Sequence, residues 1–319
     1  MWKSILSPKH LNPTIATIMI ALSTVGFALL PLFGKVLSNA GLASSAITFY
    51  RYLLPTVLLL PALTFAGQKR SASFWAISAG IAVGLGTITY LDALKSMPVA
   101  TVGVIYYTYP LFTLLIAALW LRQFPQRGVI FGVLLTIMAA FIALSPASVG
   151  SDSLKSVILS LLTPLTFAYV VIVLSQKVTQ LTPMERLVAY SLGAVIGVLP
   201  LLFSLNSSEL IPNHLTGWIP IFGMAIINYL IPQFLYVMAA PFVGSARAAV
   251  AGSLGLLTMF VIGWLAFGEQ ITLLQAVAGF LIVIAILITP AKKSKNLDLS
   301  EVSEEAKMTM PPTKVKTTA

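Results

Sequence analysis

Long hydrophobic runs separated by short polar breaks fill the chain between residues 14 and 290. Each run holds about 20 residues, the length that a helix needs to cross the ~30 Å hydrocarbon core of a bilayer. The runs do not alternate between polar and apolar positions, and they are longer than the strands of a membrane barrel, so they predict helices. We count ten runs, at 14–35, 45–66, 74–94, 99–121, 127–146, 155–175, 186–205, 216–238, 243–267 and 272–290.

The two ends of the chain differ from the runs between them. Residues 1–13 precede the first run, which we expect to act as a retained signal anchor, because it is long for a signal peptide and more runs follow. After Pro290 the sequence has few aromatic or branched apolar residues, which predicts a disordered tail at 291–319.

The composition places the protein in the membrane. Hydrophobic residues make up 58% of the 319 residues and charged residues 9%, whereas soluble domains are about 45–50% apolar and about 25% charged. This excludes a water-soluble enzyme or binding module. The net charge of +10 is spread between the runs and in the tail rather than gathered on one face, so we expect no nucleic-acid partner. The chain has no cysteine, which excludes disulfides and thiolate metal sites.

Lysine and arginine positions indicate how the predicted helices are oriented. If the N-terminus is cytoplasmic, only Lys35, Lys95 and Lys155 fall at outer helix ends, while twelve basic residues fall at inner ends or in inner segments. Positive residues are enriched on the cytoplasmic side of membrane proteins. We therefore expect a multi-pass protein of the inner (plasma) membrane with both termini in the cytoplasm. The inner group is Lys3, Lys9, Lys69, Arg70, Arg122, Arg127, Lys177, Arg186, Arg247, Lys292, Lys293 and Lys295.

The two halves of the chain match each other weakly. A shift of about 146 positions places Tyr90 on Tyr236 and Ala93 on Ala239, and a slightly smaller shift places Phe27-Ala28 on Phe167-Ala168. Five predicted helices in each half is an odd number, so equivalent helices would point in opposite directions. Inverted repeats with a site between them are a recurrent transporter design. The prediction is an all-α membrane protein with repeats at 14–146 and 147–290.

Several short strings carry a family resemblance. They are YLDAL at 90–94, YVMAA at 236–240, FYRY at 49–52, Pro110, and FGEQITLLQAVAGFLIVIAILI at 267–288. With these strings the chain resembles an EamA-type member of the drug/metabolite transporter superfamily. It departs from the pattern at Arg122-Gln123, where an acidic residue is common, and at Leu256, where a proline is typical. The resemblance implies ten helices, a central cavity between the repeats, and movement of small metabolites by alternating access.

Polar and aromatic side chains gather on one face of several predicted helices. At 100° per residue, the polar positions of the eighth run fall within an arc of about 140°. A lipid-facing amide is costly, so this face is expected toward the interior or water. The alternative is that these groups form interhelical hydrogen bonds or interface belts. The predicted substrate-binding set from these faces is Tyr90, Tyr106, Tyr109, Asn228, Tyr229, Gln233 and Tyr236.

Ionisable groups inside the runs are further candidates, because burying a charge in hydrocarbon costs at least about 2.5–3.5 kcal/mol. Arg51 is a candidate ligand for a substrate carboxylate or phosphate; alternatively it snorkels or forms a structural pair. Arg247 is a candidate binding residue or an interface anchor. Asp92 is expected to pair with Lys95 one turn away, and a proton-carrying role is its alternative. Glu269 is expected to act in capping or at the interface.

Enzyme signatures are absent from the sequence. It contains no HExxH, GxSxG, Walker A or GxGxxG string, so we expect neither catalysis nor a cofactor or metal. The predicted function is secondary transport of a small polar metabolite, an amino acid or related compound, most consistent with efflux. Coupling by protons, exchange and facilitated diffusion all stay open. The alternatives are a lipid or lipid-linked sugar flippase and a non-transporting membrane subunit, and we expect a monomer or homodimer in the lipid bilayer.

Overall fold

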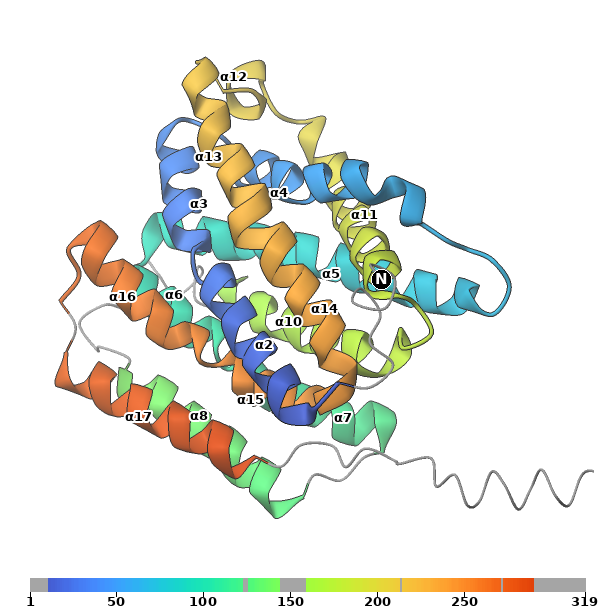
Figure 1. Ribbon diagram of the computed structural model, residues 1–319. Helices are drawn as coiled ribbons and strands as arrows, with labels where there is room; N and C mark the ends of the chain where they lie inside the picture. Colours follow the sequence, from blue (N-terminus) through green and yellow to red (C-terminus); the bar gives the residue numbers. More distant parts are fainter. Residues whose placement is uncertain (1–10, 123–125, 144–158, 213, 271, 290–319) are drawn as a thin grey trace, which may run out of the picture.

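The computed structural model describes residues 11–122, 126–143, 159–212, 214–270 and 272–289, and all regular elements in these ranges are helical. The tail at 291–319, nearly all of segment 1–13 and Lys155 lie outside the described residues. The first half contains α2 (Pro13–Phe27), α3 (Leu30–Asn39), α4 (Ser44–Leu59), η1 (Leu60–Ala62), α5 (Lys69–Ser96), α6 (Val99–Tyr106), α7 (Tyr109–Leu121) and α8 (Arg127–Ala143) (Figure 1). The second half contains α10 (Leu162–Ile172), η4 (Val173–Lys177), α11 (Pro183–Leu202), α12 (Ser207–Leu210), η5 (Leu215–Gly217), α13 (Trp218–Gly223), η6 (Met224–Leu230), α14 (Ile231–Val243), α15 (Ser245–Gly252), α16 (Gly255–Phe267) and α17 (Leu273–Ile288).

Seven helical segments are long and apolar enough to cross a membrane. They confirm an all-helical, multi-pass membrane protein, while the count of ten spans stays a prediction. The seven are Pro13–Asn39, Ser44–Ala62, Lys69–Ser96, Val99–Leu121, Pro183–Leu202, Leu215–Val243 and Ser245–Phe267, and the shorter apolar helices are Arg127–Ala139, Leu162–Lys177 and Ala276–Ile288.

Two consecutive helices of the second half repeat the bounds of two helices of the first. Shifting α6 and α7 by 146 residues gives the bounds of α15 and α16, including the interruption between them, which starts at Tyr107 in the first half and at Ser253 in the second. The carboxylate of Glu269, just after α16, accepts the backbone N–H of Val99 at 3.2 Å, which caps the start of α6. The start of the interrupted helix α6–α7 therefore lies at the end of its equivalent, α15–α16, and the two helices run antiparallel.

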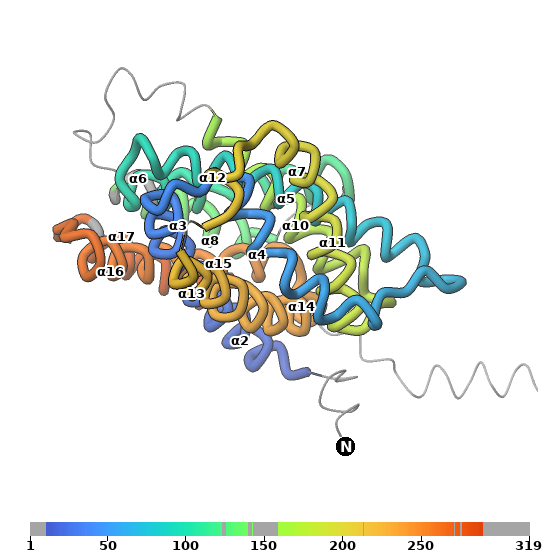
Figure 2. Tube along the Cα trace, turned by 90° about the horizontal axis from the view of Figure 1, so that it is seen from above, coloured from blue at the N-terminus to red at the C-terminus, as the bar shows by residue number. Residues whose placement is uncertain are grey.

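Helices α5 and α11 approach each other so closely that only glycine fits at the contact. A Cβ on Gly80 would collide with the carbonyl oxygen of Tyr190, and one on Gly193 would collide with that of Ile77. Helices α2 and α14 lie side by side along another seam between the halves (Figures 1 and 2). Small residues permit such close packing in membranes, where no hydrophobic force draws helices together.

Charged groups join α5 and α11 at the end where both helices begin. Lys69 Nζ lies 2.8 Å from a carboxylate oxygen of Glu185. The same carboxylate accepts the N–H of Thr182 and completes a capping box at the start of α11.

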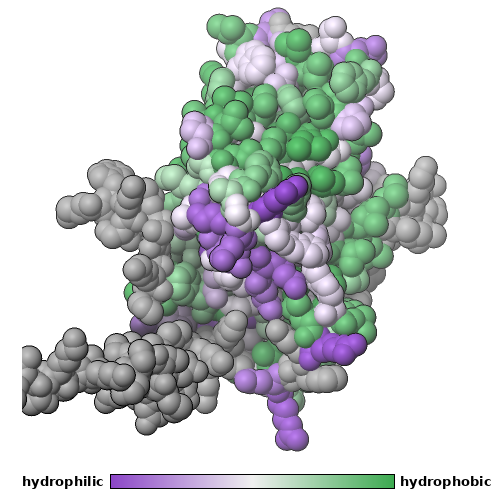
Figure 3. Space-filling model, turned by 90° about the vertical axis from the view of Figure 1, so that its right-hand side faces the viewer, coloured by the Kyte–Doolittle hydropathy of each residue, from purple (hydrophilic) through white to green (hydrophobic). Residues whose placement is uncertain are grey.

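The right-hand side of the molecule in Figure 1 shows hydrophilic residues gathered within a largely hydrophobic surface (Figure 3). This is the arrangement expected where a bundle emerges from lipid.

Candidate functional site

A cavity lies in the middle of the bundle and is lined by both halves of the chain. Ten of its lining residues come from the first half and seven from the second. Eight of them are aromatic: Phe27, Tyr52, Tyr90, Tyr106, Tyr107, Phe167, Tyr190 and Tyr229.

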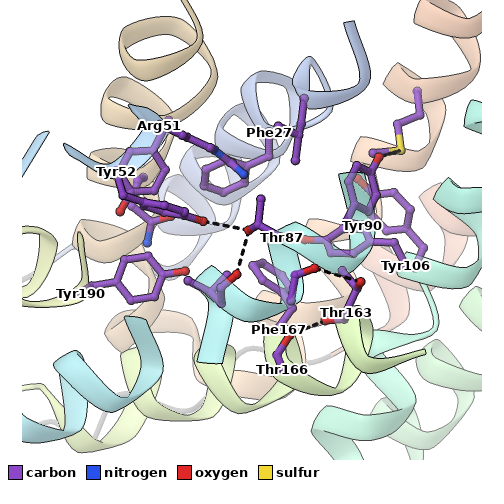
Figure 4. A pocket seen from close by; sticks show the side chains of 17 residues that line it. Phe27, Arg51, Tyr52, Thr87, Tyr90, Tyr106, Thr163, Thr166, Phe167 and Tyr190 are labelled. Atoms are coloured by element: carbon purple, nitrogen blue, oxygen red, sulfur yellow. Dashed lines mark hydrogen bonds between the residues drawn. The ribbon is translucent and has the colours of Figure 1, made fainter. Parts of the chain in front are cut away.

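The side chains close around a small space. Arg51 and Tyr52 lie on one side and Tyr90 and Tyr106 on the other, with Thr87 between them (Figure 4). The Thr87 hydroxyl donates to the carbonyl of Val83 at 2.8 Å and lies 3.1 Å from the Tyr52 hydroxyl. Centres of water molecules can reach about 50 Å³ of this space, which is room for a few waters. A metabolite therefore enters only if helices move apart.

Arg51 is the charged residue in the cavity lining. Its side chain projects from the middle of α4, the residue is 6% exposed, and Nε has no hydrogen-bond partner. The guanidinium carbon lies 5.4 Å and 5.5 Å from the ring centres of Tyr52 and Tyr229, which gives cation–π attraction. The residue is buried, so it does not snorkel, and no ion pair with a described residue holds it.

Acidic side chains in the described part of the chain are all engaged elsewhere. Asp92 pairs with Lys95, Glu185 pairs with Lys69, and Glu269 accepts from Val99. Glu209 caps α12 at Asn206. The described wall of the cavity therefore carries a positive charge without a carboxylate. The described residues also contain no cluster of His, Cys, Asp and Glu able to hold a metal.

Four more of the predicted binding residues line this cavity together with Arg51. They are Tyr90, Tyr106, Tyr229 and Gln233. The Tyr90 hydroxyl makes a long contact of 3.8 Å with the sulfur of Met259, and the Tyr229 hydroxyl lies 2.8 Å from that of Ser191. The amide nitrogen of Gln233 is buried without a hydrogen-bond partner. The cavity thus contains unpartnered N–H groups on Arg51 and Gln233.

Three predicted residues lie outside the lining and contact the helices around it. The Asn228 amide donates to the carbonyls of Gly26 and Phe27 at 2.8 and 3.0 Å, where α2 ends. The Tyr109 hydroxyl donates to the carbonyl of Ala249 at 2.7 Å. The Tyr236 ring packs near Phe27, and its buried hydroxyl has no partner. The predicted interior face is therefore buried, and part of it holds helices together.

The remaining charged candidates lie away from the cavity. Arg247 is half-buried on α15, and its Nε has no partner. Asp92 lies near the end of α5, 2.8 Å from Lys95 Nζ, and accepts a hydrogen bond from Ser44 at 2.7 Å. The expected local pair is present.

Sequence reasoning missed several lining residues. Tyr190 stands alone in an apolar run and Thr166 is one hydroxyl among many, so neither gave a signal. Phe27 and Phe167 did give one, because the repeat placed them on each other, and both line the cavity. Tyr52 stands directly after Arg51 in the quoted FYRY string.

The interruptions in the two matched helices meet beside the cavity. A Cβ on Gly255 would collide with the hydroxyl of Tyr107, and one on Gly252 would collide with the hydroxyl of Tyr109. Discontinuous helices at corresponding positions of two repeats indicate transporter binding sites. Pro110 lies in the first turn of α7, the second part of the first interrupted helix, whereas Leu256 stands at the equivalent position in α16, so the second interruption forms without proline.

The chain is similar to several proteins that are named as transporters. The pseudopaline exporter CntI of Pseudomonas aeruginosa (strain UCBPP-PA14) is 24% identical over 259 residues, 80% of this chain and 89% of that protein. An uncharacterized transporter of Archaeoglobus fulgidus is 23% identical over 78% of this chain and 88% of its own. The S-adenosylmethionine uptake transporter of Rickettsia bellii is 32% identical over 85 residues, 26% of this chain and 29% of its own.

A solved crystal structure shares the fold, with a TM-score of 0.63 and 14% identity over 87% of this chain and 98% of that one. The profile of the EamA-like transporter family matches twice, at residues 14–145 and 154–290. These ranges include the helices that surround the cavity and confirm the resemblance found in the sequence. The chain belongs to the EamA-like transporter family and is a multi-pass membrane transporter.

Proposed function

We propose that the protein is a non-enzymatic secondary transporter that binds a small polar metabolite, an amino acid or related compound, in the central cavity. The observation that carries this proposal is the cavity itself, which is lined by both matched halves of the chain. A site shared by two repeats changes its access when the repeats rock against each other. The halves would move apart at one end of the bundle and then at the other.

The proposed architecture has ten spans in two inverted repeats, 14–146 and 147–290. We propose that the protein lies in the inner membrane with both termini in the cytoplasm. The antiparallel contact between α6 and the end of α16 supports inversion. Matching helix bounds in the two halves support the repeat.

We propose export as the direction. The relative named as an exporter matches over 80% of this chain, whereas the relatives named as uptake transporters match over 26%. Net accumulation of solute in inside-out vesicles tests this direction, and net accumulation only in right-side-out vesicles would contradict it.

Filling the cavity tests the proposed site. We expect Thr87→Trp to abolish counterflow in proteoliposomes, because the indole exceeds the space that a few waters fill. Counterflow is measured with a panel of solutes that comprises amino acids, nucleosides, amines and sugar phosphates. The matched control is Leu85→Trp on the same helix, where the side chain is 43% exposed and faces outward, and this variant should retain the wild-type rate. Thermal stability of both variants establishes that they are folded.

Two results would contradict the proposal. One is that no solute of the panel exchanges faster than in protein-free liposomes. The other is that folded Thr87→Trp exchanges solute at the wild-type rate.

A further inference from the structure

We infer that the carried solute is an organic anion, and that the Arg51 guanidinium and the Gln233 amide bind its carboxylate or phosphate group. This inference rests on the proposed function, since it names the class of solute for the same cavity.

The first step is charge. Arg51 is buried at 6% exposure among aromatic rings, and every described carboxylate is engaged elsewhere. A buried charge is costly unless a charge of opposite sign and hydrogen bonds compensate it. Tyrosine rings compensate it only in part. A solute with a negative group supplies the missing compensation, whereas a cationic solute adds a second uncompensated positive charge.

The second step is hydrogen bonding. The Arg51 Nε and the Gln233 Nε2 are buried and unpartnered, and both residues line the cavity. Both atoms are donors. Several hydroxyls of the lining already have partners, such as Thr87 with Val83 and Tyr229 with Ser191. A group with several acceptor lone pairs and no hydrogen to donate fits this set, and a carboxylate or phosphate has that chemistry.

The third step is the neighbourhood of the cavity. A second hollow of about 520 Å³ lies one helical turn from the cavity along the same three helices. On α4, Ile47 lines the hollow and Arg51 lines the cavity. On α5, Leu91 lines the hollow and Thr87 lines the cavity. On α3 the equivalent pair is Gly34 and Leu30. The hollow and the cavity are therefore stacked along the same three helices.

The charge of this hollow agrees with the charge of the cavity. Lys35 and Lys95 line it, and Asp92 beside it neutralises one of them. Lys35 Nζ lies over the ring of Phe267, 4.3 Å from its centre. A cleft of one sign of charge raises the local concentration of ions of the other sign. The hollow thus adds to the positive potential beside Arg51.

A matched set of probes tests the charge of the solute. The set is 4-hydroxyphenylacetate, its neutral amide, the amine tyramine, and phenyl phosphate. Each contains one aromatic ring, which suits the aromatic walls. Binding is measured by thermal stabilisation of the purified protein at millimolar probe, and transport by counterflow in proteoliposomes. We expect the anions to bind and exchange, and the amide and tyramine to do so at least about tenfold more weakly. The two anions distinguish a carboxylate from a phosphate site.

The variant Arg51→Met tests the residue. It keeps an unbranched apolar side chain and removes the charge, so we expect the preference for 4-hydroxyphenylacetate over its amide to fall by about tenfold or more. Arg51→Lys keeps the charge and should keep part of the preference. The control is Arg70→Met, because Arg70 is exposed and lies outside the cavity lining; this variant should keep the wild-type preference.

The outcomes separate this inference from the proposed function. The inference is wrong if the amide or tyramine binds and exchanges as well as the anions, or if neither anion binds. It is also wrong if folded Arg51→Met keeps the wild-type preference. These results overturn it even where transport is observed. If anions stabilise the protein through Arg51 but no solute exchanges, the anion site stands and the transporter proposal fails.

Discussion

Arg186→Met is expected to lower the melting temperature of the purified protein by roughly 6–12 °C. Arg186 is 6% exposed, and its guanidinium donates to the carbonyls of Val178, Val237 and Thr179 at 2.9, 2.8 and 3.1 Å. Each buried carbonyl left without a donor costs about 1–3 kcal/mol. Taking about 3 kcal/mol in total, and roughly 2–4 °C per kcal/mol for a chain of this order of size, gives the stated range.

The location of these carbonyls explains why the effect should be large. Val178 and Thr179 follow the end of η4, where carbonyls have no partner within the helix. Val237 belongs to α14, so one side chain joins α11 to both elements. The measurement is thermal unfolding in detergent, with Arg70→Met as the exposed arginine control. Equal melting temperatures for the two variants would show that Arg186 does not stabilise the fold in this way.

The second large effect is expected at the glycine contact between α5 and α11. Gly80→Ala places a Cβ against the carbonyl oxygen of Tyr190 and 2.8 Å from the nitrogen of Ala194. Both atoms belong to the backbone and cannot rotate away, so α11 must shift. Overpacking of this kind costs about 1–3 kcal/mol or more. Tyr190 also lines the cavity, so the shift should disturb transport as well as stability.

A matched glycine separates overpacking from helix propensity. Gly197 lies on α11, across the same contact from Gly80 on α5, and a Cβ there would lie 3.1 Å from its nearest neighbours on Ile81. This contact is tight but milder than the collision at Gly80, and alanine is the better helix former by about 1 kcal/mol, so Gly197→Ala should cost less thermal stability than Gly80→Ala. We expect Gly80→Ala to melt well below Gly197→Ala, and equal melting of the two would contradict the close contact.

Most helix positions were predictable from the hydrophobic runs, because a backbone segment that crosses lipid must satisfy its hydrogen bonds within a helix. The predicted run 99–121 has the same bounds as the helical segment Val99–Leu121. The interruption at Ser253 was not predictable from a local signal, since Leu256 stands where proline would mark it. It forms where Gly252 and Gly255 pack against Tyr109 and Tyr107 from a distant part of the chain.

The candidate site was predictable in part. Arg51 and Gln233 stood out because polar groups in a hydrophobic run need a reason to be there. Asn228 and Tyr109 share the same interior faces, yet they bond to backbone carbonyls of other helices. Periodicity identifies which face is interior, but it does not tell which interior position borders the cavity. That distinction depends on how helices from both halves meet.

Accessibility of the cavity from each side of the membrane tests the central proposal most directly. The chain has no native cysteine, so Thr87→Cys carries a single thiol in the cavity wall. We expect an anionic, membrane-impermeant methanethiosulfonate to modify this thiol when it is added to either right-side-out or inside-out vesicles, and to leave outward-facing Leu85→Cys unmodified. Modification from both sides agrees with a cavity that opens alternately. Modification of Thr87→Cys from one side only, or from neither, would contradict it.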